Sequence, residues 1–278
     1  MFERSGMIRW GLCCIFREAP IRFRRTTAKY VSTLSPDAQK RHLSGLCLHN
    51  ANSLLEALRF CRLNGIKAFR INSQVLPLKT HPTFGYAVET LPESTKIVTA
   101  FKKCGTYSRR YDLRLSFHPD QFILLSSPNP DVTRRSIADL QYQAEVAKWV
   151  NADVINIHAG GVYGNKDEAL QRLAEHIENL PQEIGQLLTL ENDDRLYTPD
   201  DLLPICKKLA IPLVYDVHHH RCLPDGLNVK DTTQRVLETW NREPLFHISS
   251  PLTPWGEGNP RKHHDYISPE DFPESWLN

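Results

Sequence analysis

Short apolar runs alternate along this chain with longer segments in which apolar residues recur at helical spacing. Each of these longer segments leaves room for one crossover helix, which is the pattern of a parallel α/β sheet. The expected strands are residues 8–16, 68–71, 112–117, 154–157, 187–190, 213–215 and 245–248. The expected helices are residues 50–64, 95–101, 131–150, 167–180, 200–209 and 232–240. The pattern therefore predicts an α/β protein.

Five of the apolar runs end on an imidazole or a carboxylate. These residues are His118, His158, Glu191, Asp216 and His247. Because the carboxyl ends of parallel strands meet at one edge of a sheet, we expect these side chains to converge. A single histidine after a strand is more often a hydrogen-bonded structural residue than a ligand. That alternative does not explain why all five residues stand at the same position, the end of an apolar run. The mixed set suits Zn²⁺ or Mn²⁺ better than Ca²⁺ and predicts a site for more than one ion.

Candidate ligands at the ends of so many strands favour a closed barrel, because an open sheet gathers ligands only where its strand order reverses. The length of 278 residues is close to the roughly 250 residues of a TIM-type (β/α) barrel. We therefore expect one barrel domain over residues 1–278, with residues 1–6 as an N-terminal extension. No eighth apolar run is visible before Asn278, so the barrel is expected to lack or truncate its eighth strand.

Charge, cysteine spacing and hydropathy argue against several classes of protein. The formal net charge is +2, so any anionic partner must be held by a local patch of basic residues. The seven cysteines form no CxxC pair, which argues against a zinc ribbon and for reduced thiols in the cytoplasm. No signal-peptide core and no run of roughly 18 apolar residues is present, so neither secretion nor a membrane span is expected.

Two local clusters remain open to interpretation. Four arginines follow the first expected strand and are interleaved with apolar residues: Arg17, Arg22, Arg24 and Arg25. They are either a solvated surface loop or contacts for DNA phosphates. The three consecutive histidines 218–220 cannot all face one site, because neighbours on a strand or its loop point to alternate sides. We expect His218 and His220 to be structural or to face solvent.

Several motifs taken together resemble the ultraviolet-damage endonuclease family of the UvdE or UvsE type. They are Phe-His-Pro-Asp-Gln-Phe at 117–122, Arg-Ile-Asn-Ser-Gln-Val-Leu-Pro-Leu-Lys-Thr-His-Pro at 70–82, Asn-Ile-His-Ala-Gly-Gly at 156–161, Leu-Thr-Leu-Glu-Asn-Asp at 188–193, Val-Tyr-Asp-Val-His-His at 214–219, Phe-His-Ile-Ser-Ser at 246–250 and His-His-Asp-Tyr-Ile at 263–267. The resemblance runs from about Met7 to Phe272. As a set these motifs are highly specific, although none of them would be alone.

The resemblance implies a metal-dependent DNA repair endonuclease that cuts the phosphodiester 5′ to ultraviolet photoproducts. It places metal ligands at His81, His118, His158, Glu191, Asp216, His219, His247 and His263. It implies up to three divalent ions, Mn²⁺ foremost with Zn²⁺ or Mg²⁺ as alternatives, and catalytic roles for Glu191, Asp216 and His247.

The resemblance also indicates how the substrate is bound. Gln121 and Phe122 match the pair that probes the lesion, and the family often has tyrosine at the second of these positions. Beside such a site, Arg22, Arg24 and Arg25 would contact phosphates. The implied partner is damaged double-stranded DNA in the cytoplasm, at the nucleoid, with no membrane and no obligatory protein partner.

Two departures from the family pattern affect the predicted metal site. Leu245 stands where the family has a lysine that can be carboxylated to bridge metals, and Asp265 is a candidate substitute. The family's eighth strand, with a further glutamate ligand, has no counterpart here. The alternatives are an apurinic-site endonuclease, a sugar-isomerase-like barrel enzyme, or a truncated inactive relative that binds damaged DNA.

Overall fold

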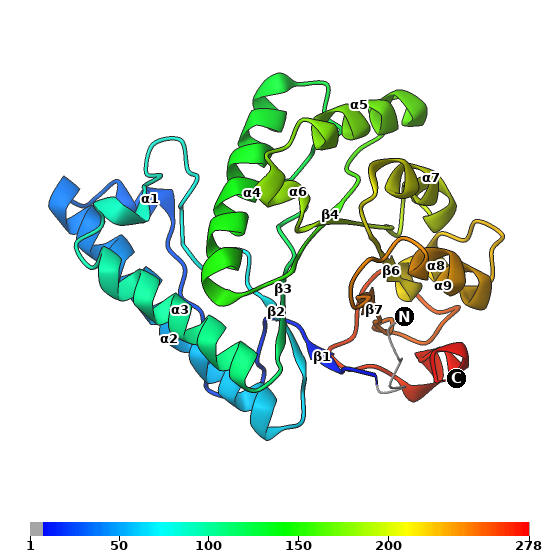
Figure 1. The fold of residues 1–278 in the computed structure, drawn as a ribbon, viewed down its shortest axis with the longest axis horizontal. Helices are drawn as coiled ribbons and strands as arrows, with labels where there is room; N and C mark the ends of the chain where they lie inside the picture. The colour runs from blue at the N-terminus through cyan, green and yellow to red at the C-terminus, as the bar shows by residue number, and fades with distance from the viewer. Residues whose placement is uncertain (1–7, 278) are drawn as a thin grey trace. The chain divides into compact units, whose positions relative to one another are not determined.

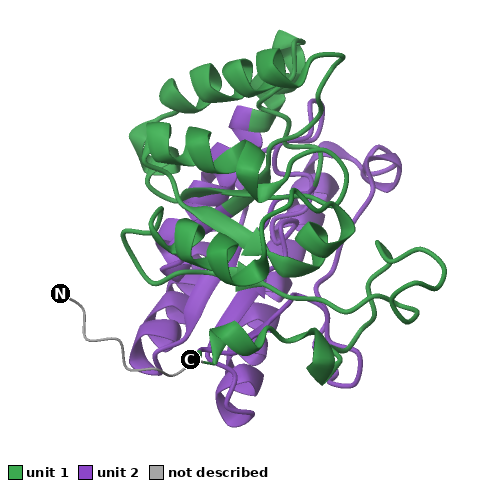
Figure 2. Ribbon diagram, turned by 90° about the vertical axis from the view of Figure 1, so that its right-hand side faces the viewer, with its two compact units in different colours: residues 1–8, 121–136, 156–278 green, residues 9–120, 137–155 purple. Residues whose placement is uncertain are grey.

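The structure is a computed structural model that describes residues 8–277. The expected extension at residues 1–6 lies outside the described residues. The chain forms two compact units (Figure 2). Unit 2 comprises residues 9–120 and 137–155, and unit 1 comprises Ile8 with residues 121–136 and 156–277.

Seven parallel strands are found among residues 8–277, one for each predicted apolar run (Figure 1). They are β1 (Gly11–Leu12), β2 (Ala68–Ile71), β3 (Arg114–Phe117), β4 (Val154–His158), β5 (Leu188–Glu191), β6 (Leu213–Asp216) and β7 (Phe246–His247). Strands pair in chain order, β1 to β2 to β3 to the start of β4 in unit 2, and β5 to β6 to β7 in unit 1. This order confirms the α/β class and the TIM-type (β/α) architecture.

Helices follow most strands. They are α1 (Ala28–Val31), α2 (Pro36–Leu63), α3 (Ser94–Arg110), α4 (Pro130–Val150), α5 (Lys166–Glu178), α6 (Gln182–Gly185), α7 (Pro199–Leu209), α8 (Val217–Cys222) and α9 (Val229–Leu237), with short 3₁₀ turns at Val88–Thr90, Pro269–Asp271 and Glu274–Trp276. Helix α2 begins fourteen residues before the predicted start at Asn50. Its first turn contains Pro36, whose missing N–H costs nothing there, and Leu43, Leu46 and Cys47 continue its buried face.

In unit 1 the core lies around the two central strands. All four residues of β5 and all four of β6 are buried, as expected for parallel strands covered on both faces. Leu188, Leu190 and Leu213 have no solvent-exposed surface, and each such side chain contributes roughly 1.5–3 kcal/mol through burial. The polar residues that end these strands therefore project from a rigid frame.

In unit 2 the two long helices α2 and α3 lie side by side (Figure 1). Leu54 and Leu58 of α2 and Ile97 and Phe101 of α3 are fully buried. Gly105 of α3 is needed because a Cβ there would lie 2.5 Å from the carbonyl oxygen of Trp149.

None of the helices found within residues 8–277 has both the length and the apolar character that a bilayer crossing demands.

Candidate metal centre

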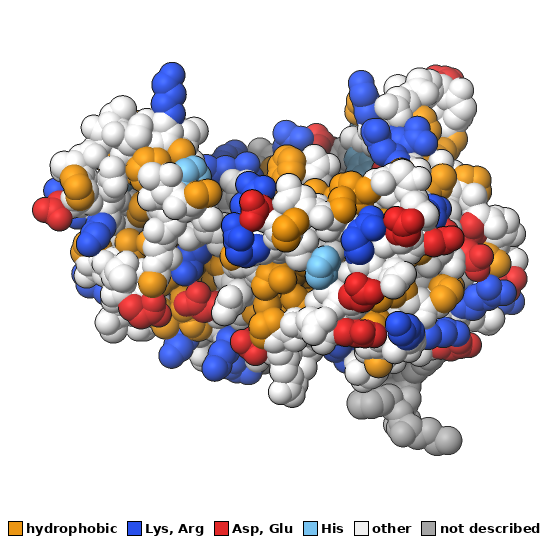
Figure 3. Space-filling view, turned by 90° about the horizontal axis from the view of Figure 1, so that it is seen from above, with side chains coloured by type: hydrophobic (Ala, Val, Ile, Leu, Met, Phe, Trp, Pro, Cys, Tyr) orange, Lys and Arg blue, Asp and Glu red, His pale blue; other side chains and the backbone are white. Residues whose placement is uncertain are grey.

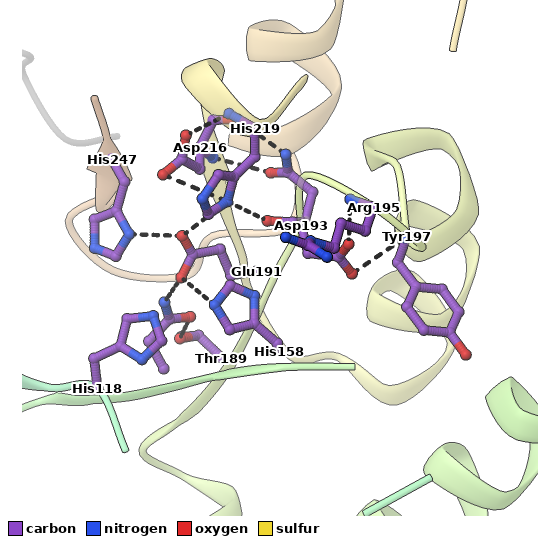
Figure 4. Close-up of polar contacts among 12 residues, drawn as sticks. His118, His158, Thr189, Glu191, Asp193, Arg195, Tyr197, Asp216, His219 and His247 are labelled. Atoms are coloured by element: carbon purple, nitrogen blue, oxygen red, sulfur yellow. Dashed lines mark hydrogen bonds and ion pairs between the residues drawn. The ribbon is translucent and has the colours of Figure 1, made fainter. Parts of the chain in front are cut away.

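Three strand-end residues of unit 1 lie around a fourth, Glu191 (Figure 4): His158, Asp216 and His247. Glu191 is the last residue of β5 and is 1% exposed. His247, which ends β7, donates a hydrogen bond from Nδ1 to Glu191 Oε1 over 2.8 Å. The Nε2 atom of His158, the last residue of β4, lies 4.0 Å from Glu191 Oε2. The predicted convergence of strand ends is therefore observed in unit 1.

Asp216 and His219 form the second part of the cluster. Asp216 ends β6, pairs in register with His247, and caps the N-terminus of α8 by accepting a hydrogen bond from the His219 backbone N–H over 2.8 Å. This cap turns the chain into a helix directly after the strand, where the sequence suggested only a strand or its loop. One helical turn then brings the His219 Nδ1 atom to 3.6 Å from Asp216 Oδ2 and 3.7 Å from Glu191 Oε1.

The donor set fits a divalent cation. One potential ligand atom each from Glu191, Asp216 and His219 lies within 4.8 Å of the other two. Both carboxylates are almost fully buried, and a cation between them would stabilise two like charges in such surroundings. Burial lowers the pKa of the His219 imidazole, but the charges of Asp216 and Glu191 outweigh it and hold this pKa above its ordinary value. Imidazole nitrogens with carboxylate oxygens are typical ligands of Zn²⁺ and Mn²⁺.

Buried amides hold the two carboxylates in place. Asn156, inside β4, donates to Glu191 Oε2 and accepts from the Thr189 hydroxyl over 2.8 Å. Asn192 and Asp216 exchange two hydrogen bonds of 2.9 Å, side chain to backbone, which tie the ends of β5 and β6 together. These amides were not among the site residues predicted from the sequence. The available signal was an asparagine inside an otherwise apolar strand, because a buried amide must find partners.

The other two histidines of α8 are structural. His218 is fully buried, with its ring nitrogens 3.1 Å from Ser249 O and 2.9 Å from Pro260 O. His220 is also buried, between the Tyr215 hydroxyl at 2.7 Å and an Asp225 oxygen at 2.8 Å. The expectation of a structural role holds, whereas the alternative that they face solvent was wrong. In a helix, all three side chains find different surroundings because successive residues point about 100° apart.

His263 reaches the cluster from the segment after β7. Its ring centroid lies 4.7 Å from that of His218 and 5.6 Å from that of His219. An isolated antiparallel bridge to Pro251 fixes this segment. Asp265 lies exposed two residues farther on, and Leu245 directly precedes β7. A ligand role for Asp265 in place of the family's lysine stays a prediction.

Two predicted ligands belong to unit 2. His118 follows β3 and donates from Nδ1 to the Pro119 carbonyl over 3.1 Å. His81 accepts from the backbone N–H groups of Thr83 and Phe84, at 3.1 and 3.2 Å, through its own Nδ1. His118 donates through Nδ1, so its Nε2 keeps the lone pair that a ligand role needs. His81 uses the lone pair of Nδ1 to accept from the backbone, so its neutral ring carries the proton on Nε2, and a ligand role for His81 stays a prediction.

The predicted DNA contacts differ in how they are held. Phe122 of unit 1 is 73% exposed, and Gln121 beside it is exposed as well. In unit 2, Arg22 donates to the carbonyl oxygens of Phe16, Ala19 and Ile21 over 2.7–3.0 Å, so its guanidinium shapes its own loop. The side chains of Arg24 and Arg25 are exposed. The face in Figure 3 shows basic and acidic side chains interspersed, in keeping with a net charge of +2.

Comparisons with known proteins agree with this geometry. The model of the family described as UV-endonuclease UvdE matches residues 8–277. The UV DNA damage endonuclease of Bacillus velezensis is 35% identical over 274 residues, which cover 96% of this chain and 82% of that protein. Its namesake from Bacillus pumilus is 38% identical over 253 residues, which cover 87% of this chain and 75% of that protein.

Solved structures lead to the same family. The crystal structure of SacUVDE superposes with a TM-score of 0.83 at 27% identity, covering 95% of this chain and 87% of that one. Endonuclease IV from Thermus thermophilus has a TM-score of 0.52 at 16% identity, over 77% of this chain and 76% of that chain, which shows a shared fold alone. The match over nearly all described residues establishes that this chain belongs to the UV-endonuclease UvdE family.

Proposed function

We propose that this protein is a metal-dependent endonuclease that hydrolyses the phosphodiester on the 5′ side of ultraviolet photoproducts in double-stranded DNA. The observation that carries the proposal is the buried pair Glu191 and Asp216, which face the histidines of unit 1. A buried pair of carboxylates is costly without a cation, so the arrangement supports a site built to bind one. Membership of the UV-endonuclease family supports the choice of reaction.

Glu191, Asp216 and His219 would hold a divalent ion, with His158 and His247 beside them. From the resemblance we further propose ligand roles for His81, His118 and His263, up to three ions, and Mn²⁺ as the metal. Bound divalent ions would supply Lewis-acid stabilisation to the phosphoryl oxygens as charge develops there.

Hydrogen bonds within unit 1 orient the side chains for this role. His219 donates from Nδ1 to the Asn192 carbonyl over 3.0 Å, so its Nε2 carries the lone pair. Glu191 is held from two sides by Asn156 and His247. Catalysis gains from such fixed ligands because no reorganisation is needed during the reaction.

Recognition of damage would use the exposed pair Gln121 and Phe122. A photoproduct stacks and pairs poorly, so separating it from the duplex costs less than separating an intact pair. An aromatic wedge such as Phe122 can then enter the duplex and stabilise the opened form. Exposed Arg24 and Arg25 would contact phosphates without reading sequence. We propose that the protein acts at the nucleoid as one functional domain without an obligatory protein partner.

The test uses three end-labelled duplexes of one sequence, carrying a single photoproduct, an abasic site or no damage. With Mn²⁺, the proposal expects a cut directly 5′ to the photoproduct and an intact undamaged duplex. Addition of a chelator should abolish cutting. Preferential cutting of the abasic duplex would move the assignment to an apurinic-site endonuclease, and failure to cut any duplex by folded, Mn²⁺-loaded protein would contradict the proposal.

A further inference from the structure

We propose that Tyr163, in the loop between β4 and α5, is a stacking platform for a nucleotide base that leaves the duplex at the lesion. This inference rests on the proposed function and adds a substrate-contacting residue to it. The expected ligand is an unstacked base of damaged DNA, which presents a flat aromatic face to the tyrosine ring.

The backbone of Tyr163 is held in an unfavourable conformation. Its φ angle is +48°, in the left-handed region that bulky residues rarely adopt, and 42% of its surface is exposed. An exposed tyrosine gains little from burial to offset this cost. Strained residues of this kind persist where the surrounding structure enforces them, and they gather at ligand-binding sites.

The loop beneath the ring is fixed by hydrogen bonds. The carbonyl oxygen of Gly161 accepts from the Tyr197 hydroxyl at 3.2 Å and from the Ser126 hydroxyl at 3.3 Å. One side of the Tyr163 ring lies so close to Gly161 that a Cβ there would meet ring atom Cζ at 3.2 Å. The glycine thus supports the ring from one side and restricts its orientation.

Tyr197 connects this loop to the metal centre. It is fully buried and pairs with Asp193, which donates its backbone N–H to Tyr197 O at 2.9 Å and accepts from Tyr197 N–H at 3.1 Å through Oδ2. Asp193 follows Glu191 by two residues, and Figure 4 shows Tyr197 on the loop that leaves β5. The loop that carries Tyr163 is therefore bonded, through the Gly161 carbonyl and Tyr197, to the segment that follows Glu191.

The loop of Tyr163 also contacts the loop of the predicted wedge. A Cβ on Gly160 would lie 2.5 Å from Ser126 Oγ and 3.3 Å from Leu124 Cδ2, so the two loops touch without room for a side chain. Phe122, which is 73% exposed, precedes Leu124 by two residues. Two exposed aromatic rings on touching loops suit a mechanism in which one fills the gap in the duplex and the other stacks on the displaced base.

Arg172 adds a cation beside this platform. Its Nε donates to Ser126 O at 3.1 Å, and its Cζ lies 6.0 Å from the centre of the Tyr163 ring. The guanidinium, which also pairs with Glu168 Oε2 at 3.7 Å, therefore reinforces the contact between the two loops.

The experiment compares the wild type with Tyr163→Ala, Tyr163→Phe and Tyr111→Ala, all loaded with Mn²⁺. Alanine retains a Cβ, so the backbone strain is unchanged and only the ring is removed. Tyr111 is a control tyrosine at the C-terminus of α3, a helix end that leads into a strand. Affinity is measured by fluorescence anisotropy for a duplex with one photoproduct and a methylphosphonate at the cut position, and for its undamaged counterpart.

The proposal expects Tyr163→Ala to raise Kd for the damaged duplex by roughly 5- to 150-fold, the range for loss of one stacked base. Kd for the undamaged duplex should stay within about twofold, and Tyr163→Phe and Tyr111→Ala should bind as the wild type does. A Tyr163→Ala protein that binds the damaged duplex like the wild type, or that weakens equally on both duplexes, would overturn this inference alone. A wild type without preference for the damaged duplex would overturn both this inference and the proposed function.

Discussion

The histidines of unit 1 and those of unit 2 have different surroundings. In unit 1, His219 and His247 lie beside the buried carboxylates Glu191 and Asp216, and His219 Nδ1 also donates to the Asn192 carbonyl. In unit 2, the Nδ1 atoms of His81 and His118 bond to backbone groups. A backbone group orients an imidazole, whereas two buried carboxylates are stabilised by nearby positive charge. The position of buried carboxylates therefore identifies the cation centre better than the number of histidines does.

The largest effect is expected from Asp216→Asn. Asparagine is as good an N-cap for α8 as aspartate, so the fold should be retained. The change removes one of the two buried charges, and incision should fall by more than roughly 100-fold, because changes outside the ligand shell alone cost about 10- to 100-fold. Plasmid incision with Mn²⁺ measures this loss.

The matched control is Asp153→Asn in unit 2, which breaks a 3.0 Å ion pair with Arg114 at the beginning of β3 and β4, the end opposite to His118 and His158. Its incision rate should stay close to that of the wild type. Equal losses of incision rate in the two variants would show that the buried carboxylates of unit 1 have no special role in the reaction.

A smaller effect is expected from Asn156→Leu. Leucine has a similar volume but cannot hold Glu191, so the affinity for Mn²⁺ should fall by roughly 10- to 100-fold in calorimetric titration. Thr189→Val should cost less, because its hydroxyl reaches Glu191 only through Asn156. Unchanged Mn²⁺ affinity in the Asn156 variant would show that the amide does not position Glu191 for metal binding.

A buried carboxylate that is held by N–H groups should affect stability rather than metal binding. The Asp225 side chain is 6% exposed and accepts from the backbone N–H groups of Leu227 and Asp200 and from His220. Burial raises its pKa, but these hydrogen bonds outweigh burial and hold the pKa below its usual value of 3.8. The stabilisation is thus present above pH 3.8 and is lost as pH falls through the lower, folded-state value.

Asp225→Asn should therefore lower the free energy of unfolding at pH 7 by about 1–3 kcal/mol. The difference from wild type should shrink below the ordinary carboxyl pKa. Urea unfolding at several pH values checks this, with the exposed Asp231→Asn as control. If the free energies of unfolding of Asp225→Asn and the wild type differ by the same amount at all pH values, the ionised Asp225 carboxylate is not the source of the stabilisation.

The smallest effect concerns the arginine loop of unit 2. Arg25→Gln should weaken binding to damaged and undamaged duplexes alike and reduce the slope of log K against log salt by about 0.9 for one lost phosphate contact. Arg22→Gln should leave that slope unchanged and destabilise the loop, because this guanidinium already binds three carbonyl groups. A salt slope that falls for Arg22 but not for Arg25 would reverse their roles.

Much of the fold could be predicted because buried parallel strands are short apolar runs. All seven strands lie within or beside the predicted ranges. The first half of α2 was missed because residues 39–42 are Gln-Lys-Arg-His and interrupt the apolar pattern. Helix α8 was missed because its start depends on the Asp216 side chain, which caps it, and not on periodicity.

The site was predictable where a ligand follows a strand, as at Glu191 and Asp216. The supports of these residues were not predictable, since the bond from Asn156 to Glu191 joins residues 35 positions apart. The loop of Tyr163 is likewise held by hydrogen bonds from Ser126 and Tyr197 to the Gly161 carbonyl, which join residues 35 and 36 positions apart.

The most direct test is incision of supercoiled plasmid, irradiated or not, by the wild type and by Glu191→Gln, with Mn²⁺ or with chelator. We expect nicking of irradiated plasmid only, by the wild type only and with Mn²⁺ only. Nicking that survives in Glu191→Gln or in chelator would contradict the claim that the buried carboxylate centre of unit 1 carries the reaction, as would the absence of nicking by folded, Mn²⁺-loaded wild type.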